Sequence, residues 1–344
     1  MDGFRKVAAL YQELDEPWGQ ASALCQAGNY ATNLGEHTLA LKLHQEAVEL
    51  SRKVGEPHRL GISLESLAYD HLILGQWEDG SRLMHEAAAS FMAAGDLWAT
   101  ARAKLHLGVM LGWTGHLVEA RQIVELSLPL LRQAGYRSDI VYGTLALGTG
   151  EMGLGEYTQA EHTLQVAVEA ARQDGFVREQ AFCLAMLGLV ALIQGEVPRA
   201  LTRVDESISI YRGIQAAGEL GMALGVLFLV QRNLGRDEPA RAALKEALRI
   251  AVGTKSRFTV ITLSTALVVF LLDAGKVELA LQSYAAARQV PMVACWRWFE
   301  DISGQELQAK MTSLPPEVRQ AAEQQSGETD IFDLFARILA ELER

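Results

Sequence analysis

Two short segments of the chain come close to motifs that bind nucleotides or zinc. A Walker A loop needs a glycine directly before its Lys-Ser/Thr pair and a second glycine upstream, and Gly253-Thr254-Lys255-Ser256 has neither. His85 and Glu86 begin the helical zinc motif His-Glu-x-x-His, but Ala89 stands where the second histidine is required. The sequence therefore predicts neither site.

The other residues with catalytic potential do not form a catalytic set or a metal site. His37 and His44 lie seven positions apart on one expected helix, which supplies at most two metal ligands, so we expect both to be solvated. The acidic neighbours Glu78-Asp79 point in different directions on a helix and form no acid/base dyad. The glycine-rich stretch 148–155 follows no predicted strand and is expected to serve packing. We predict no catalytic residue, no metal and no cofactor, and hence no enzyme.

The composition excludes several classes of protein. The 344 residues carry 31 Lys+Arg against 42 Asp+Glu, a formal net charge of −11, which argues against direct nucleic-acid binding and against an anionic membrane surface. No apolar run reaches the roughly 18 residues of a membrane span, and the N-terminus lacks a secretory apolar segment. Cys25, Cys183 and Cys295 form no CxxC pair. We expect a cytoplasmic protein.

The strongest pattern in the sequence is a 40-residue repeat. Glycine recurs at this spacing at Gly35, Gly75, Gly115, Gly155, Gly195, Gly235 and Gly275. A small residue follows each glycine after five positions, at Ala40, Gly80, Ala120, Ala160, Ala200, Ala240 and Ala280. Another follows after twelve, at Ala47, Ala87, Ser127, Ala167, Ser207, Ala247 and Ala287. Eight positions before each glycine stands leucine or, once, Ala27.

Each of these columns has a place in a pair of packed helices. Small side chains are needed where two helix backbones approach closely, and glycine suits a turn with positive φ between the helices. A second column, Gly55, Gly95, Gly135 and Gly175, is expected to end the second helix, with Asp15 in the same slot one period earlier. Each unit then holds two helices of about 16–18 residues, which predicts an all-α solenoid of antiparallel helix pairs.

The units resemble tetratricopeptide (TPR) repeats. The run Leu154 to Ala160, with Leu164 and Ala167, looks like the second half of such a repeat, and Leu-Gly at 107–108, 147–148 and 187–188 matches the first-helix pair of that family. The 40-residue period departs from the usual 34 and is similar to the MalT-like subclass, found in C-terminal sensor arms of bacterial signal-transduction ATPases of the STAND class. The resemblance implies a right-handed superhelix whose concave surface is lined by the first helices.

The columns divide the chain into three parts. Residues 1–16 read as the second helix of a truncated leading repeat, 17–291 as seven repeats, and 292–344 as a helical C-terminal cap. The half-repeat leads us to expect that the natural protein continues upstream; the alternative is that this lone helix is itself an N-terminal cap.

The tail has its own pattern. Trp296 and Trp298 are expected to seal the last repeat, with a docking surface as the alternative. The segment 314–318, Leu-Pro-Pro-Glu-Val, reads as a loop entering a short helix. Asp330 can cap a final helix with an apolar stripe of Ile331, Leu334, Phe335, Ile338, Leu339 and Leu342.

Candidate binding residues follow one face of the first helices, counted back from each repeat glycine. In the second to fifth units this face carries aromatic, basic and other side chains suited to recognition: Tyr69, Trp98, Arg102, His106, Trp113, Tyr142, Thr149, Arg178, Phe182 and Met186. Aromatic rings offer rigid contact area, and arginine offers a fork for carboxylates or phosphates. The alternative is that these side chains belong to the core.

Two functions fit this reading. The first is a sensor arm that binds an inducer (a small molecule, peptide or protein) in the concave groove and relays its presence to an ATPase module upstream in the same polypeptide. The second is a constitutive scaffold that clamps a partner peptide without switching. An enzyme is disfavoured because no catalytic set converges.

Overall fold

The computed structural model describes residues 2–74, 76–311 and 330–343. Regular structure in these ranges is helical, and they contain no strand. The chain divides into two compact units, unit 1 (Met1–Gly143) and unit 2 (Thr144–Arg344), and helix α8 (Arg137–Leu154) contributes residues to both.

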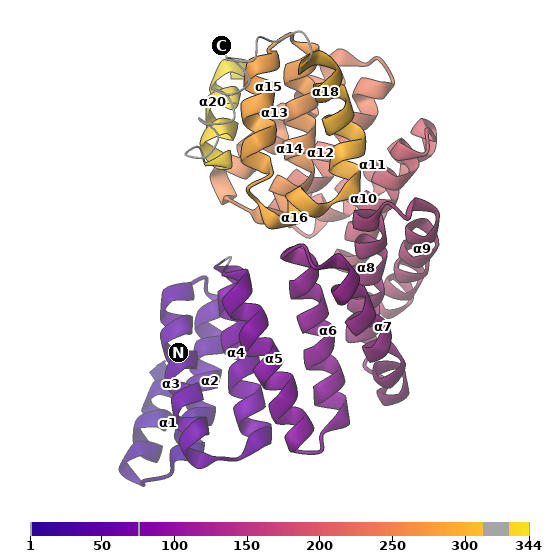
Figure 1. Cartoon of the computed structure of the whole chain (residues 1–344). Helices are drawn as coiled ribbons and strands as arrows, with labels where there is room; N and C mark the ends of the chain where they lie inside the picture. Colours follow the sequence, from indigo (N-terminus) through magenta and orange to yellow (C-terminus); the bar gives the residue numbers. More distant parts are fainter. Residues whose placement is uncertain (1, 75, 312–329, 344) are drawn as a thin grey trace. The chain divides into compact units, whose positions relative to one another are not determined.

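Unit 1 consists of helices joined in pairs by tight turns (Figure 1). The first helices of the pairs are α2 (Pro17–Asn33), α4 (Pro57–Ile73) and α6 (Leu97–Trp113). The second helices are α3 (His37–Val54), α5 (Trp77–Ala93) and α7 (Leu117–Ala134), and α1 (Asp2–Glu13) precedes them all. Each first helix packs on its own second helix and on the second helix of the preceding pair.

Unit 2 continues the same pattern. Its first helices are α8, α10 (Val177–Ile193), α12 (Ala217–Asn233) and α14 (Arg257–Asp273). Its second helices are α9 (Tyr157–Asp174), α11 (Val197–Gly213), α13 (Asp237–Thr254) and the shorter α15 (Val277–Ala287). The tail forms α16 (Pro291–Cys295), α17 (Arg297–Phe299), a π-helical turn η1 (Glu300–Gly304), α18 (Gln305–Met311) and α20 (Ile331–Glu343).

The turns lie where the glycine columns predict them. The glycines of both columns that the structure describes stand between helices with φ from 67° to 95°. Asp15 takes the same left-handed conformation at φ 57°, as expected, and Gln215 (57°) and Lys255 (49°) do so in the later slots of its column. Gly75 lies outside the described residues. The all-α, TPR-like solenoid class expected from the sequence is confirmed.

The helices of a pair approach closely at their small residues. A methyl group added at Gly188 of α10 would lie 2.4 Å from Cγ2 of Val204 and 3.3 Å from the carbonyl oxygen of Ala200. At Gly108 of α6 it would lie 3.1 Å from the carbonyl oxygen of Ala120. Ala120 and Ala200 belong to the same 40-residue column, so the repeat marks the place where two backbones nearly touch.

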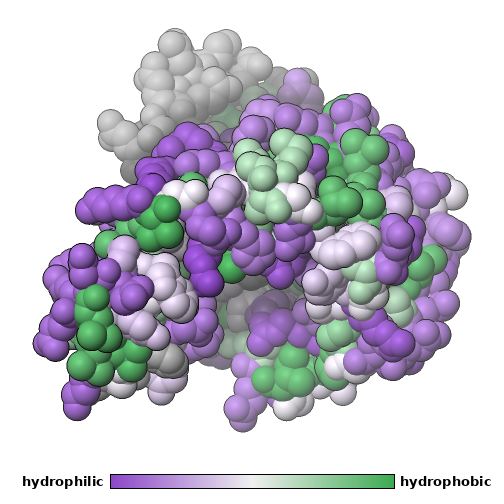
Figure 2. Space-filling model, turned by 90° about the horizontal axis from the view of Figure 1, so that it is seen from below, coloured by the Kyte–Doolittle hydropathy of each residue, from purple (hydrophilic) through white to green (hydrophobic). Residues whose placement is uncertain are grey.

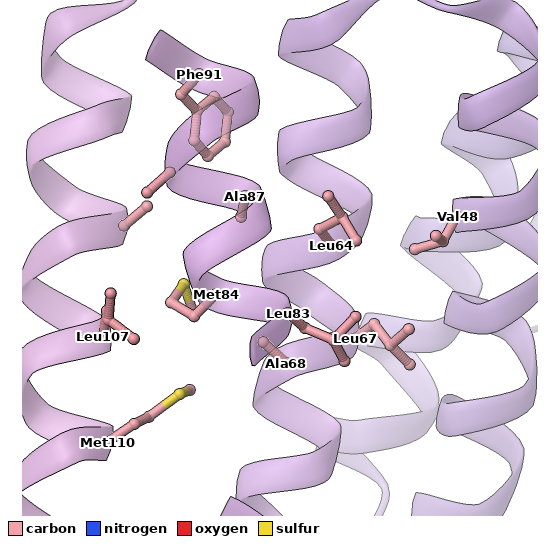
Figure 3. Close-up of a cluster of buried hydrophobic side chains, with 12 residues drawn as sticks. Val48, Leu64, Leu67, Ala68, Leu83, Met84, Ala87, Phe91, Leu107 and Met110 are labelled. Atoms are coloured by element: carbon pink, nitrogen blue, oxygen red, sulfur yellow. The ribbon is translucent and has the colours of Figure 1, made fainter. Parts of the chain in front are cut away.

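The core of unit 1 fills the space between successive pairs. Figure 3 shows side chains of α4, α5 and α6 pointing toward one another, with Met84 and Phe91 of α5 among them. Phe91 is fully buried, and Gly61 faces its ring closely because it has no side chain of its own.

His44 is not the solvated histidine that the sequence pattern suggested. Its side chain is buried, with Nδ1 2.5 Å from Oδ2 of Asp70 and Nε2 3.2 Å from the carbonyl oxygen of Cys25. Thr32 donates a hydrogen bond to the other oxygen of Asp70 at 3.0 Å. The imidazole fits because Gly28 leaves the space that a Cβ would fill, 2.4 Å from Nε2. The expectation of a surface histidine is therefore wrong.

Helix α1 stands one 40-residue period before α3 and so has the position of a second helix. Val7 occupies the column that holds Ala47, Ala87 and their counterparts, which are at most 2 % exposed, yet Val7 is 41 % exposed. In the later pairs this column lies against the first helix of the same pair, and α1 has none before it. An upstream continuation of the polypeptide remains a prediction.

The tail packs as the sequence suggested. Trp298 and Phe299 are 1 % and 0 % exposed and Trp296 is also buried, so these rings seal the last pair and do not form a docking surface. Helix α20 is capped by Asp330, whose Oδ1 accepts a hydrogen bond from the backbone N–H of Phe332 at 2.7 Å. The buried stripe of Ile331, Leu334, Phe335 and Ile338 belongs to this helix, which packs on α13. The segment 314–318 lies outside the described residues.

We predict that the close approach at Gly188 governs stability. Gly188→Ala should lower the free energy of unfolding by about 1–3 kcal/mol, because Val204 is short, branched and fully buried and the helices must separate. Gly150, inside α8, has no neighbouring atom within 4 Å of an added methyl, so Gly150→Ala should stabilise by about 0.5–1 kcal/mol through helix propensity. Urea unfolding of the two variants checks this, and equal effects would contradict it.

Candidate functional site

Helices α4 and α6 and residues 137–143 of α8, all within unit 1, bring charged side chains to one place. Arg102 of α6 donates two hydrogen bonds to the carboxylate of Glu65 on α4, from Nε at 3.2 Å and from Nη2 at 2.8 Å. The side chain of Glu65 is 11 % exposed and that of Arg102 is 33 % exposed. This forked pair therefore reaches from a nearly buried carboxylate toward solvent.

His106, one turn along α6 from Arg102, links this pair to Tyr69 on α4 and to one further helix, α8. Its Nδ1 lies 2.7 Å from the hydroxyl of Tyr69 on α4 and 3.3 Å from Oε1 of Glu65. Its Nε2 lies 4.0 Å from Oδ1 of Asp139 on α8. We call Glu65, Tyr69, Arg102, His106 and Asp139 the polar cluster, and the side of unit 1 formed by α2, α4, α6 and residues 137–143 the first-helix face.

The protonation of His106 decides which bonds the cluster makes. A neutral ring without hydrogen on Nδ1 accepts a hydrogen bond from the Tyr69 hydroxyl, whereas a ring that carries this hydrogen donates it to Glu65. A doubly protonated ring would also present Nε2–H to Asp139. The imidazole thus stands between two carboxylates from different helices.

The pKa values of the two carboxyl groups are shifted in opposite directions, downward for Glu65 and upward for Asp139. Burial acts to raise the pKa of Glu65, but the hydrogen bond from His106 and the charge of Arg102 outweigh it and hold this pKa below its usual value. Burial raises the pKa of Asp139, and the neighbouring charge of Glu65 adds to the rise against the opposing effect of His106 and Arg102. Burial also raises the pKa of Tyr69, so its hydroxyl stays neutral.

This arrangement is suited to recognising a cation. With a neutral imidazole, two carboxylates face a single guanidinium, so the cluster carries one net negative charge. Glu65 is already engaged by Arg102, whereas Asp139 is 16 % exposed and lies 4.0 Å from the imidazole of His106. A positively charged group entering beside Asp139 would balance the excess charge.

The structure brings together part of the predicted binding set. Tyr69, Arg102 and His106 belong to the polar cluster, and the ring of Tyr142 lies 6.0 Å from that of His106. Trp113 instead stacks on Trp77 at the start of α5, with ring centroids 5.2 Å apart and planes 16° from parallel. Trp98 is half-buried in the first turn of α6.

The four candidates in unit 2 do not gather in the same way. Arg178 is mostly exposed and pairs with Glu219 of the next first helix. Thr149 donates its hydroxyl to carbonyl oxygens of its own helix, and Phe182 is half-buried. Met186 is fully buried, which corrects its assignment to an accessible surface, because its side chain points between the helices and not away from them.

Sequence reasoning missed Glu65 and Asp139. Glu65 stands in a column whose next two members are Leu105 and Leu145, so a charge in an otherwise apolar column was the available signal. Asp139 has no comparable signal, because Arg59, Glu179 and other polar residues share its column. Only the tertiary structure shows that Asp139 faces His106, with Oδ1 4.0 Å from Nε2.

The near-motifs of the sequence have ordinary structural places. Gly253 and Thr254 end α13, and Lys255 and Ser256 form the turn to α14. Glu86 pairs with Arg52 at 2.9 Å. Among the residues that the structure describes, no three His, Cys, Asp or Glu side chains lie close enough to hold a metal ion. Within the same residues, none of the helices combines the length and the apolar character needed to cross a bilayer.

Apolar side chains at the surface are dispersed in the face that Figure 2 shows, as small green patches separated by polar residues. Exposed residues such as Met92, Val118 and Leu126 lie on different second helices or different turns of them.

Comparison with known proteins supports the fold. No protein-family model and no curated protein sequence matches the chain. Solved structures of TPR-like repeat proteins are similar to it at low identity. The apo form of RapI is 14 % identical with a TM-score of 0.63, covering 86 % of this chain and all (100 %) of that one. A Rap protein complexed with competence and sporulation factor is 15 % identical with a TM-score of 0.61, covering 99 % and 81 %.

A third similar structure is a STAND protein with a tetratricopeptide repeat sensor from Pyrococcus horikoshii. It is 16 % identical with a TM-score of 0.55, covering 94 % of this chain and 46 % of that protein. The present chain thus corresponds to about half of that protein's length. Together these likenesses identify a TPR-like α-solenoid, the class that the repeat columns predicted.

The lowered pKa of Glu65 predicts a pH-dependent contribution to stability. Its stabilising effect is present above its ordinary pKa of about 4.5 and is lost as the pH falls through the lower folded value. The destabilisation caused by Glu65→Gln should therefore be largest near neutral pH and shrink between about pH 5 and pH 3. Urea unfolding across this range measures it. Glu125→Gln, at an exposed pair on α7, should show little effect at any pH.

The raised pKa of Asp139 predicts the opposite dependence of stability on pH. A carboxyl whose folded pKa is raised adds stability below its ordinary pKa, about 3.8, and loses that contribution as the pH rises through the folded value. Asp139→Asn, which cannot ionise, should therefore be at least as stable as the parent at pH 7. Thermal and urea unfolding at pH 7 check this. A loss of more than about 1 kcal/mol would instead assign Asp139 a structural role.

Proposed function

We propose that this chain is the sensor part of a larger signalling protein and binds an inducer, a peptide or protein segment, on the first-helix face of unit 1. The polar cluster carries the proposal, because three successive first helices direct ionisable groups to one spot. At the Glu65 column the next two first helices hold leucine, so packing alone does not require a charge there.

The similar structures support a binding role. One is a Rap protein complexed with competence and sporulation factor, and another is NprR in complex with its cognate peptide NprX. The similar STAND protein carries its tetratricopeptide repeat as a sensor. By analogy, we infer that the solenoid reports an inducer to an ATPase module elsewhere in the same polypeptide.

Signalling then follows from population shift. A ligand that bridges α4, α6 and α8 contacts helices whose spacing depends on how the pairs stack, so it binds best to one stacking arrangement. At saturation, the ligand shifts the equilibrium between the two stacking arrangements by the ratio of its affinities for them. A constitutive scaffold would use the same face but would bind all arrangements equally.

We infer binding and not turnover from the chemistry of the cluster. The carboxylate of Glu65 is neutralised by Arg102, and burial raises the pKa of Tyr69 so that its hydroxyl is a poor nucleophile. What remains is a set of charges and hydrogen-bond donors fixed on rigid helices, which suits recognition.

A selection of displayed random peptides on this chain tests the proposal. We expect enriched peptides to lose at least about tenfold in affinity, about 1.4 kcal/mol, on Asp139→Asn, since the variant keeps the shape of the site but removes its charge. Isothermal titration with the synthetic peptides measures the change.

Glu125→Gln is the matched control for this experiment. It removes one carboxylate from an exposed second helix of the same unit and should leave affinity unchanged. Peptides whose affinity is equally insensitive to both substitutions would rule out the polar cluster as the binding site.

A further inference from the structure

A hollow opens in unit 1 between α2, α3 and α4. It has a volume of about 130 Å³ and is walled by Trp18, Val54 and Ile62, which are 43 %, 36 % and 41 % exposed. Exposed apolar side chains around one cavity are unusual for a surface that stays in water, because covering them contributes about 25 cal/mol per Å². We call this cavity the Trp18 pocket.

The polar groups on the floor of the Trp18 pocket already form hydrogen bonds with one another. The hydroxyls of Ser51 and Ser63 lie 2.9 Å apart, and Sγ of Cys25 lies 3.4 Å from the Ser63 hydroxyl. These three groups satisfy one another, so the pocket favours an apolar guest. Cavities of about 150 Å³ hold a benzene-sized molecule, so 130 Å³ suits a four-carbon aliphatic side chain.

The mouth of the pocket is held in place by a cation–π contact. The guanidinium carbon of Arg59 lies 4.6 Å from the centre of the Trp18 ring, and Arg59 also pairs with Glu56 at 3.3 Å. This contact favours the position in which the indole forms one wall of the pocket, which lowers the entropy cost of binding.

Helix α4 connects the Trp18 pocket to the polar cluster. It supplies Ile62 and Ser63 to the pocket and Glu65 and Tyr69 to the cluster. Seven residues of helix rise by about 10 Å, and neighbouring helix axes lie about 8–10 Å apart. Asp139 lies on α8, two first helices beyond α4, so the proposed cation site is about 16–20 Å from α4. Three or four residues of extended peptide span about 10–14 Å at about 3.3–3.6 Å each, and the extended side chain of a lysine or arginine covers the remainder.

We propose that the Trp18 pocket and the polar cluster are two subsites for one ligand, an extended peptide with an aliphatic side chain three or four positions from a lysine or arginine. The aliphatic group fills the pocket, and the cation lies beside Asp139. This inference rests on the proposed function and adds the chemistry of the ligand. The excess negative charge of the cluster and the apolar walls of the pocket each select one end.

Four synthetic peptides test the inference directly. Each is acetylated and amidated and joins leucine to lysine through two or three glycines, in either order. We expect at least one to bind at least tenfold more tightly than its leucine→glycine and lysine→glutamine forms. Nuclear magnetic resonance of the full chain should show the Ile62 δ1-methyl signal and the Arg102 Nε signal shifting together in the same titration.

A matched pair of variants isolates the pocket. Ser22 is exposed and lines the cavity, so Ser22→Phe should fill its mouth and reduce affinity to that of the leucine-free peptide, whereas Ser22→Ala should bind like the parent. Equal binding by both variants would overturn the two-subsite inference. The inference would also fail if none of the four peptides bound at 10 mM, a concentration that corresponds to a binding free energy of about −2.7 kcal/mol.

The outcome also separates this inference from the proposed function. Displayed peptides that depend on Asp139 but ignore Ser22→Phe and lack the aliphatic residue would leave the proposed function standing and remove the second subsite. Displayed peptides that depend on neither position would remove both.

Discussion

The close contact between the two helices of each pair is the constraint on which the rest of the structure depends. At Gly108 and Gly188 the backbone of one helix lies so near the other that a single methyl group meets a carbonyl oxygen or a buried branched side chain. Small residues must therefore recur every 40 positions, and the turns beside them must accept positive φ. Each pair becomes a rigid unit whose remaining faces are free to vary.

Because the helix pairs are rigid, side chains on the first-helix face keep fixed positions relative to one another. Polar groups on neighbouring first helices, such as Glu65, Arg102 and Asp139, are held at distances set by helix packing and not by flexible loops. The binding site that we propose on this scaffold would lose little conformational entropy when a ligand arrives. The cost is electrostatic, because Asp139 is kept where burial disfavours its charge.

Polar groups inside the same stack serve a different purpose. His44 and Asp70 are almost completely buried and satisfied by each other, by Thr32 and by a backbone carbonyl. They join α2, α3 and α4 within the core and present nothing to a ligand. Burial and satisfaction thus distinguish this pair from the polar cluster, whose Arg102 reaches solvent and whose Asp139 is only loosely engaged.

The sequence by itself determined the period, the helix pairs and the turn positions, because these depend on local residue types: glycine or Asp15 at positive φ and small residues at close contacts. It also indicated Arg102 and His106 from helical spacing. Only the tertiary structure decided that Glu65 and Asp139 join them and that Met186 is buried. The reason is physical: a 40-residue column specifies which side of a helix faces its partner, whereas contacts across successive pairs depend on how those pairs twist and stack.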